Sequence, residues 1–188
     1  GPAIDAHIQA IVDAAAAPIR WILCTHTHID HSPGAAPLAA RTGAPVLGMR
    51  ARYPERQDAT FAPTRELAHG ERLEVGGCRL RMLHTPGHAS NQLCFLDEAE
   101  RLLFTGDHLM QGSTVVINPP DGDMATYLAS LRLLLPEALD CIAPGHGFLM
   151  ARPHEMVERV LVHRVARENK VLAALAAHGP ATLEDLVP

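Results

Sequence analysis

The sequence predicts a layered α/β fold, because short apolar runs alternate with segments of helical periodicity and polar residues follow the runs on connecting loops. Strand-like runs occur at Trp21–Cys24, Pro45–Gly48, Arg79–Leu83, Gln92–Leu96, Arg101–Phe104 and Cys141–Ala143. Helical periodicity occurs at Ile4–Ala15, Ala35–Arg41, Met124–Leu135 and His154–Ala177. Mixed elements of this kind are typical of a sandwich in which helices cover sheets.

The longest predicted helix is also the clearest. Its apolar residues fall on or near one face, and a His-Gly-Pro stop follows it at His178. The apolar residues of this face are Val157, Val160, Leu161, Val165, Leu172 and Leu175.

Four potential metal ligands lie within six consecutive positions, from His26 to His31. The segment reads His-Thr-His-Ile-Asp-His and follows the apolar run that ends at Cys24. Imidazole nitrogens bind Zn²⁺ and its neighbours, and a carboxylate oxygen completes a hydrolytic site. Gathering three imidazoles and a carboxylate costs desolvation and repulsion that no core requires. The segment therefore predicts most of the ligands of a two-metal centre rather than a merely polar loop.

Three further candidate ligands follow strand-like runs. They are His88 in His-Thr-Pro-Gly-His, Asp107 in Phe-Thr-Gly-Asp-His and His146 in Ala-Pro-Gly-His-Gly. A strand holds its last residue at the sheet edge, and Gly or Pro then turns the chain so that a side chain points into the crevice. Ligands placed in this way are held by a sheet rather than by a flexible loop.

Together these motifs resemble the metallo-β-lactamase fold superfamily over about residues 20–150. The resemblance implies an αββα sandwich and a dinuclear metal centre. The implied ligands are His26, His28 and His88 for one metal, Asp30, His31 and His146 for the other, and Asp107 as the bridge. A bridging carboxylate keeps two cations about 3.5–4 Å apart, where they can share and activate one hydroxide.

A narrower resemblance is to the lactamase-like endoribonuclease branch, whose members append a small winged-helix-like segment to the hydrolase domain. It rests on Gly112–Val116, Asp123–Leu131 and the stretch from His163 to Leu172. The tail Ala181–Val187 resembles only the opening of that segment. We therefore expect a hydrolase domain over residues 1–150, and over residues 151–188 a long helix with the beginning of the winged-helix-like segment.

The chain departs from the superfamily pattern at its start. Such proteins usually begin with several strands, one of which ends in an Asp-Thr-Gly-like turn beside the metals. Here Ile4–Ala15 already predicts the helix that follows that turn. We expect either a piece of a longer protein or a sandwich that lacks its N-terminal strands.

Composition narrows the class of protein. A chain of 188 residues with 47% hydrophobic residues can bury a core and favours one main domain. No run approaches the roughly 18 apolar residues of a membrane span, and no signal-peptide pattern opens the chain, so we expect a cytoplasmic location and no membrane partner. The four cysteines stand in apolar runs at irregular spacing, which predicts free thiols. The oligomeric state stays unknown at this point.

Charge argues against nucleic acid without excluding it. The formal net charge is −5, Lys170 is the only lysine, and no basic run is present. Two divalent metals would offset about four negative charges locally, so the mouth of the site can still be positive.

Other polar residues fit less specific roles. We expect isolated histidines at the surface or at helix ends, and His84 as a buried strand histidine rather than a support for the site. His108 adjoins Asp107, but strand alternation points it elsewhere, and a substrate contact stays open. His163 and Arg164 either face solvent or contact a substrate phosphate. The isolated histidines are His7, His69, His154 and His178.

The motifs predict a metal-dependent hydrolase in which a metal-bound hydroxide attacks an ester, thioester, amide or phosphodiester. No serine lies in a G-x-S-x-G setting, and Asp30 or Asp107 can orient the hydroxide or receive its proton. We expect two Zn²⁺ ions, although Fe or Mn could use the same ligands. RNA is a leading substrate candidate and a glyoxalase II-like thioester follows closely. A β-lactam is less favoured because Asp107 supplies a bridge, and a non-catalytic metal-binding scaffold is the remaining alternative.

Overall fold

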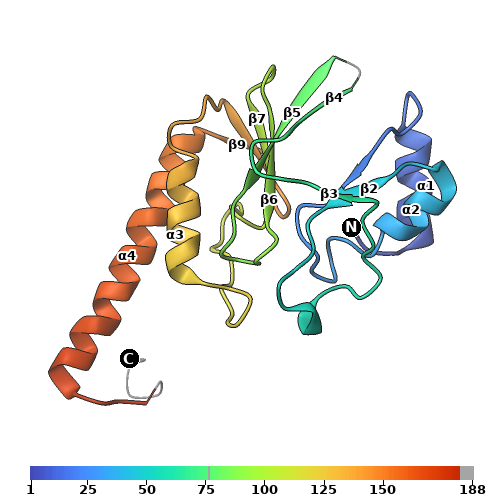
Figure 1. The fold of residues 1–188 in the computed structure, drawn as a ribbon. Helices are drawn as coiled ribbons and strands as arrows, with labels where there is room; N and C mark the ends of the chain where they lie inside the picture. The colour runs from blue at the N-terminus through green and yellow to red at the C-terminus, as the bar shows by residue number, and fades with distance from the viewer. Residues whose placement is uncertain (76, 183–188) are drawn as a thin grey trace.

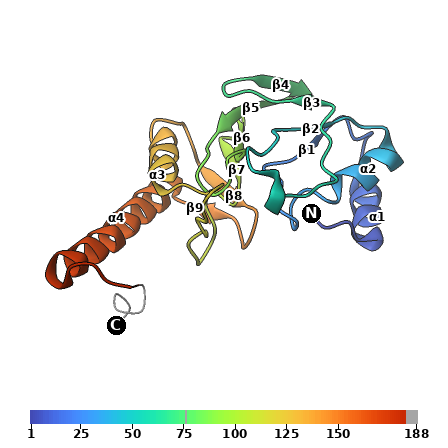
Figure 2. The ribbon, with the colours of Figure 1, turned by 60° about the horizontal axis from the view of Figure 1, so that its bottom comes forward.

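In the computed structural model, which describes residues 1–75 and 77–182, two β-sheets lie between two layers of helices (Figure 1). Helices α1 (Asp5–Ala14) and α2 (Ala35–Thr42) cover the outer face of the smaller sheet. Helices α3 (Met124–Leu133) and α4 (Pro153–His178) cover the larger sheet, and the C-terminal part of α4 extends away from it (Figure 2). The predicted α/β sandwich is confirmed.

The smaller sheet is parallel and has three short strands. Its order is β1 (Ile22–Leu23), β2 (Val46–Gly48) and β3 (Arg65–Glu66). Ile8 of α1 and Leu38 of α2 are buried in the same cluster as Ile22 and Val46. This cluster fixes α1 and α2 against the sheet, and therefore the loop between β1 and α2.

The larger sheet has six strands in sequence order, β4 to β9. Strands β4 to β7 are antiparallel neighbours, β8 is parallel to β7, and β9 is antiparallel to β8. The strands are β4 (Arg72–Val75), β5 (Cys78–His84), β6 (Leu93–Asp97), β7 (Leu102–Gly106), β8 (Cys141–Pro144) and β9 (Met150–Ala151). A short 3₁₀ turn, η1 (Pro54–Arg56), lies between β2 and β3.

Strand β6 shows why this chain forms a sandwich. All five of its residues are buried. Leu93 and Phe95 join a cluster that includes Leu47 of the smaller sheet, whereas Cys94 and Leu96 join the cluster under α3 and α4. A strand covered on both faces reads as a nearly continuous apolar run, here Leu93 to Leu96 before the terminal Asp97, so β6 forms the centre of the fold.

All six predicted strands and four predicted helices are present, with ends that differ by up to two residues. Three strands were missed. β3 consists of two exposed charged residues, β4 carries Arg72 and Glu74, and β9 has two residues, so none gives an apolar run. The cysteines are free, as predicted.

The predicted winged-helix-like segment and the predicted domain boundary stay predictions. Most of the predicted winged-helix-like opening, residues 183–188, lies outside the described residues, and the division at residue 150 stays a prediction. Among the described residues, none of the helices combines the length and apolarity that crossing a membrane requires.

Candidate metal centre

The ends of several strands meet at one edge of the sandwich. Strands β5 and β7 are both antiparallel to β6, and β8 is parallel to β7, so β5, β7 and β8 end at the same edge. His88 follows β5, Asp107 comes directly after β7, and His146 lies two residues after β8. The loop after β1 joins them, because Leu93 donates its backbone N–H to the carbonyl oxygen of Thr25 at 2.7 Å. The structure therefore brings all seven predicted ligands together.

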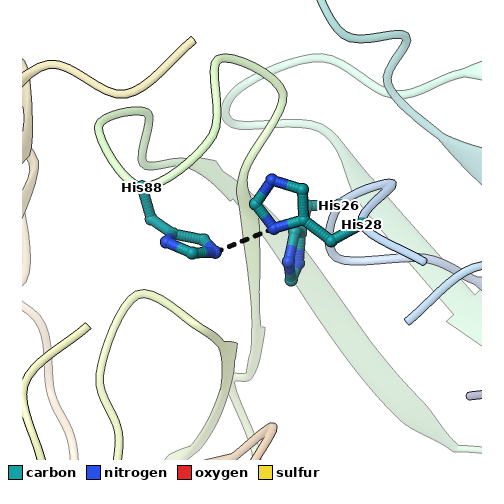
Figure 3. Close-up of side chains that lie close together, drawn as sticks. All are labelled: His26, His28 and His88. Atoms are coloured by element: carbon teal, nitrogen blue, oxygen red, sulfur yellow. Dashed lines mark hydrogen bonds between the residues drawn. The ribbon is translucent and has the colours of Figure 1, made fainter. Parts of the chain in front are cut away.

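His26, His28 and His88 form the first ligand set (Figure 3). One nitrogen from each lies within 4.8 Å of the other two. His28 Nδ1 and His88 Nε2 are 3.0 Å apart, and His26 Nε2 is buried without a hydrogen-bond partner in the described chain. Two nitrogen ligands on a tetrahedral zinc ion lie about 3.3 Å apart, so this converging arrangement suits a divalent metal.

Asp30, His31 and His146 form the second ligand set. His31 Nε2 and His146 Nε2 are 3.2 Å apart, and Asp30 Oδ2 lies 3.4 Å from the first and 3.3 Å from the second. This set is more open to solvent, since the side chains of Asp30 and His146 are 55% and 46% exposed.

Asp107 lies between the two sets. Its Oδ1 is 3.3 Å from His31 Nε2, and its Oδ2 is 3.7 Å from His88 Nε2. The adjoining Gly145 has no room for a side chain, because a Cβ atom there would lie 2.7 Å from Asp107 Oδ1. One carboxylate therefore offers an oxygen to each set, which is the arrangement that a bridging ligand needs.

Protonation of these groups also suits a metal. Burial, followed by the neighbouring histidines, lowers the pKa of His26, and burial together with His88 lowers the pKa of His28. Burial raises the pKa of Asp107, but the hydrogen bond and charge of His31 outweigh it and leave the pKa lowered. Neutral imidazoles and an ionised carboxylate are the forms that bind metals.

Two of the candidate ligands, His26 and His88, are also fixed by contacts of their second ring nitrogen, Nδ1. Thr25 Oγ1 lies 3.2 Å from His26 Nδ1, and His88 Nδ1 lies 2.6 Å from the carbonyl oxygen of Val116. A carbonyl can only accept, so His88 Nδ1 carries the proton and Nε2 keeps a lone pair for a metal. The residues present therefore fit a pair of divalent cations.

Three residues whose roles the sequence left open belong to neither ligand set. His108 is fully buried with its ring 5.2 Å from that of Tyr127, so it does not contact substrate. Arg164 Nη2 donates to the carbonyl oxygen of Val115, an inward contact that the sequence did not indicate. His84 Nε2 pairs with the Ser90 carbonyl oxygen at 2.9 Å and is half-buried, a support for the turn that carries His88.

A pocket of about 570 Å³ opens beside the first ligand set. Its apolar walls come from Tyr53, Val116 and Pro120. Two carboxylate side chains, those of Glu55 and Asp121, make another part of its wall acidic. The remaining lining residues are His28, Gln57, His88 and Asn118.

A chain of hydrogen bonds fixes the acidic wall. Thr27 Oγ1 donates to Gln57 Oε1 at 2.7 Å, and Gln57 Nε2 donates to Asp121 Oδ2 at 3.0 Å. Asp121 Oδ1 is buried and has no donor among the described residues. Sequence reasoning missed this wall, because its residues lie on separate loops without a motif.

The family model described as "Metallo-beta-lactamase superfamily" matches residues 2–146. The chain belongs to this superfamily. Thioesterase pkgB of Emericella nidulans is 36% identical over 160 residues, which are 85% of this chain and 44% of that protein. The lactamase-like protein nscB of Trichophyton rubrum is 30% identical over 177 residues, 94% of this chain and 52% of that protein.

Solved structures give the same fold. The structure of TTHA1623 in a di-iron-bound form is similar to this chain, with 28% identity and a TM-score of 0.68 over 79% of this chain and 80% of that one. A β-lactamase domain protein from Burkholderia ambifaria shares the fold at 20% identity, with a TM-score of 0.80 over 97% of this chain and 67% of that one. The chain spans about half the length of the first two curated relatives, at 44% and 52%.

Proposed function

We propose that this superfamily member is a dinuclear metal-dependent hydrolase of small uncharged thioesters or esters. The observation that carries the proposal is the pocket beside His28 and His88, which has apolar walls and two acidic side chains. An apolar acyl group would bury its surface there, whereas a negatively charged group on the substrate would be repelled by Glu55 and Asp121. The name of thioesterase pkgB supports the same substrate class.

The candidate residues have separate roles in the proposed reaction. Asp107 would hold two cations at a fixed separation, with His26, His28 and His88 on one and Asp30, His31 and His146 on the other. Two such cations would supply a water of lowered pKa and polarise the acyl oxygen under attack. Asp30 is the base we favour, because its Oδ2 faces His31 and His146 while the side chain is 55% exposed at the mouth of the site. We take Zn²⁺ as the default metal from the histidine-rich ligands, and iron as the alternative, since a structural relative is described in a di-iron-bound form.

RNA cleavage is the weaker alternative. A phosphodiester chain that entered the pocket would bring negative charge against Glu55 and Asp121. Arg164, which could have faced a substrate phosphate, instead contacts Val115 and Tyr127.

A location in the cytoplasm remains part of the proposal.

A matched set of substrates tests the proposal. We expect the highest kcat/KM for a neutral aryl or acyl thioester, less for a thioester of equal length that ends in a carboxylate, and none for single-stranded RNA or a nitrocefin-like lactam. Glu55→Gln should narrow the gap between the two thioesters several-fold, whereas Glu158→Gln, at an exposed position on α4, should not change it. Cleavage of RNA with no thioester hydrolysis would overturn the proposal.

A further inference from the structure

Arg164 is tied to the carbonyl group beside the one that holds a proposed ligand. Its Nη2 donates to the Val115 carbonyl oxygen, and the next carbonyl, that of Val116, accepts from His88 Nδ1 at 2.6 Å. Residues 115 and 116 form part of an irregular connection between β7 and α3, which has no sheet to fix it. The Val115 side chain is buried in the cluster under α3 and α4, and the contact of its carbonyl with Arg164 adds a second anchor for the backbone against which the His88 ring is set.

Tyr127 connects the same arginine to two ligand loops. The guanidinium carbon of Arg164 lies 5.6 Å from the centre of the Tyr127 ring, and the buried Tyr127 hydroxyl donates to the His108 carbonyl oxygen at 2.9 Å. Tyr127 also touches the turn before His88, because a Cβ atom on Gly87 would lie 2.3 Å from Tyr127 Cα. Tyr127 thus contacts the residue that follows Asp107 and the residue that precedes His88.

Filling space does not explain an arginine at this position. Its Nε is buried and has no hydrogen-bond partner in the described chain. Burying part of a guanidinium costs desolvation, and an apolar side chain of similar volume packs at least as well. What the arginine adds is a donor on a planar group that can both stack on Tyr127 and reach the carbonyl of Val115.

We propose that Arg164 and Tyr127 are positioning residues of the metal centre: Arg164 fixes the carbonyl that sets the tautomer and ring orientation of His88, and Tyr127 holds the adjoining loops of His88 and Asp107. Helix α4 thereby acts on His88, which lies far from it in the sequence. The part of this inference that concerns metal affinity rests on the proposed function, whereas the part that concerns the His88 ring does not.

Two measurements test it on the 188-residue chain. The first is the tautomer and ring environment of His88, read by ¹⁵N NMR of the histidine side chains in the metal-free protein. The second is the affinity for Zn²⁺ by competition with a chromophoric chelator, together with the visible spectrum of the Co²⁺-loaded protein. Arg164→Met should give a mixture of His88 tautomers, weaken metal binding about 10- to 100-fold and change the Co²⁺ spectrum.

Conservative variants separate positioning from packing. Arg164→Lys should restore part of the wild-type His88 signal, since an ammonium can still donate to Val115 but cannot stack as a plane. Tyr127→Phe removes only the hydroxyl and should alter the Asp107 side of the site, which keeps the test valid if Arg164→Met does not fold. Arg167→Met, at an exposed position on the same helix, is the matched control and should behave as wild type.

The outcomes separate this inference from the proposed function. Wild-type His88 spectra in Arg164→Met, or equal changes in Arg164→Met and Arg167→Met, would overturn the positioning role even if the protein is an active hydrolase. A changed His88 tautomer in a protein that binds no metal would support the positioning role while the proposed function fails.

Discussion

The two ligand sets differ in how firmly the fold holds them. In the first, His26 is 1% exposed, and His26 and His88 each have the second ring nitrogen paired with a neighbouring group, Thr25 or the Val116 carbonyl. In the second, Asp30 and His146 are 55% and 46% exposed. Side chains that are already fixed lose less entropy on binding. We therefore expect the first set to bind its metal more tightly and the second to exchange its metal more readily.

Removing one ligand from each set should give the largest difference. His26→Ala should lower metal affinity by more than the roughly 10–100-fold that a supporting residue contributes, because it removes a buried ligand that also lies close to His31 and Asp107. His146→Ala should lose one metal and keep the other. Metal content after dialysis against a chelator measures both. One retained metal in His26→Ala and none in His146→Ala would reverse the comparison.

Asp107→Asn should weaken the link between the sets. We expect the fold to persist and turnover to fall about a hundredfold or more, because a neutral amide cannot balance two cations or keep their separation. Steady-state kinetics with metal analysis measures this. Near-wild-type turnover with two metals retained would remove Asp107 from the centre.

Acid should destabilise the interior behind the ligands through His108. Burial, with a smaller contribution from the charge of His88, lowers the pKa of His108 to about 3. The unfolded chain takes up this proton below about pH 6.5 while the folded chain stays neutral, so this stability is present above pH 6.5 and is lost as the pH falls. Between pH 7 and pH 5, wild type should lose about 2 kcal/mol more than His108→Phe in urea unfolding. Parallel pH curves for the two proteins would contradict the burial of a neutral imidazole.

His69→Ala should have the smallest effect. His69 is exposed and belongs to neither ligand set, and its Nδ1 accepts a hydrogen bond from the His84 backbone N–H at 3.2 Å. We expect a change in unfolding free energy within about 0.5 kcal/mol and unchanged metal content. Loss of a metal in this variant would show that ligand placement depends on groups outside the site.

The convergence of the candidate ligands could be predicted from sequence because each lies within a short motif at the end of an apolar run. His88, Asp107 and His146 follow β5, β7 and β8, and strands that share a direction present such residues at one edge whatever the loops do. The main strands were equally visible, since burial on both faces makes β6 apolar from Leu93 to Leu96.

What could not be predicted depends on loops and on long-range contacts. Glu55 and Asp121 line one pocket although 66 positions separate their numbers, and neither stands in a pattern that indicates the other. From its place on a helix, Arg164 was expected either to face solvent or to contact a substrate phosphate. Its contact with the Val115 carbonyl follows from neither expectation. The short polar strand β3 forms by pairing with β2, and its own residues contain no apolar run that would indicate a strand.

Stepwise metal binding tests the central claim most directly. Zn²⁺ is titrated into metal-free protein while calorimetry counts equivalents and histidine NMR signals report which ring responds. We predict two equivalents per chain, the first shifting His26, His28 and His88 and the second shifting His31 and His146. Binding of fewer than two ions, or a first ion that shifts His31 and His146 before His26, would contradict it.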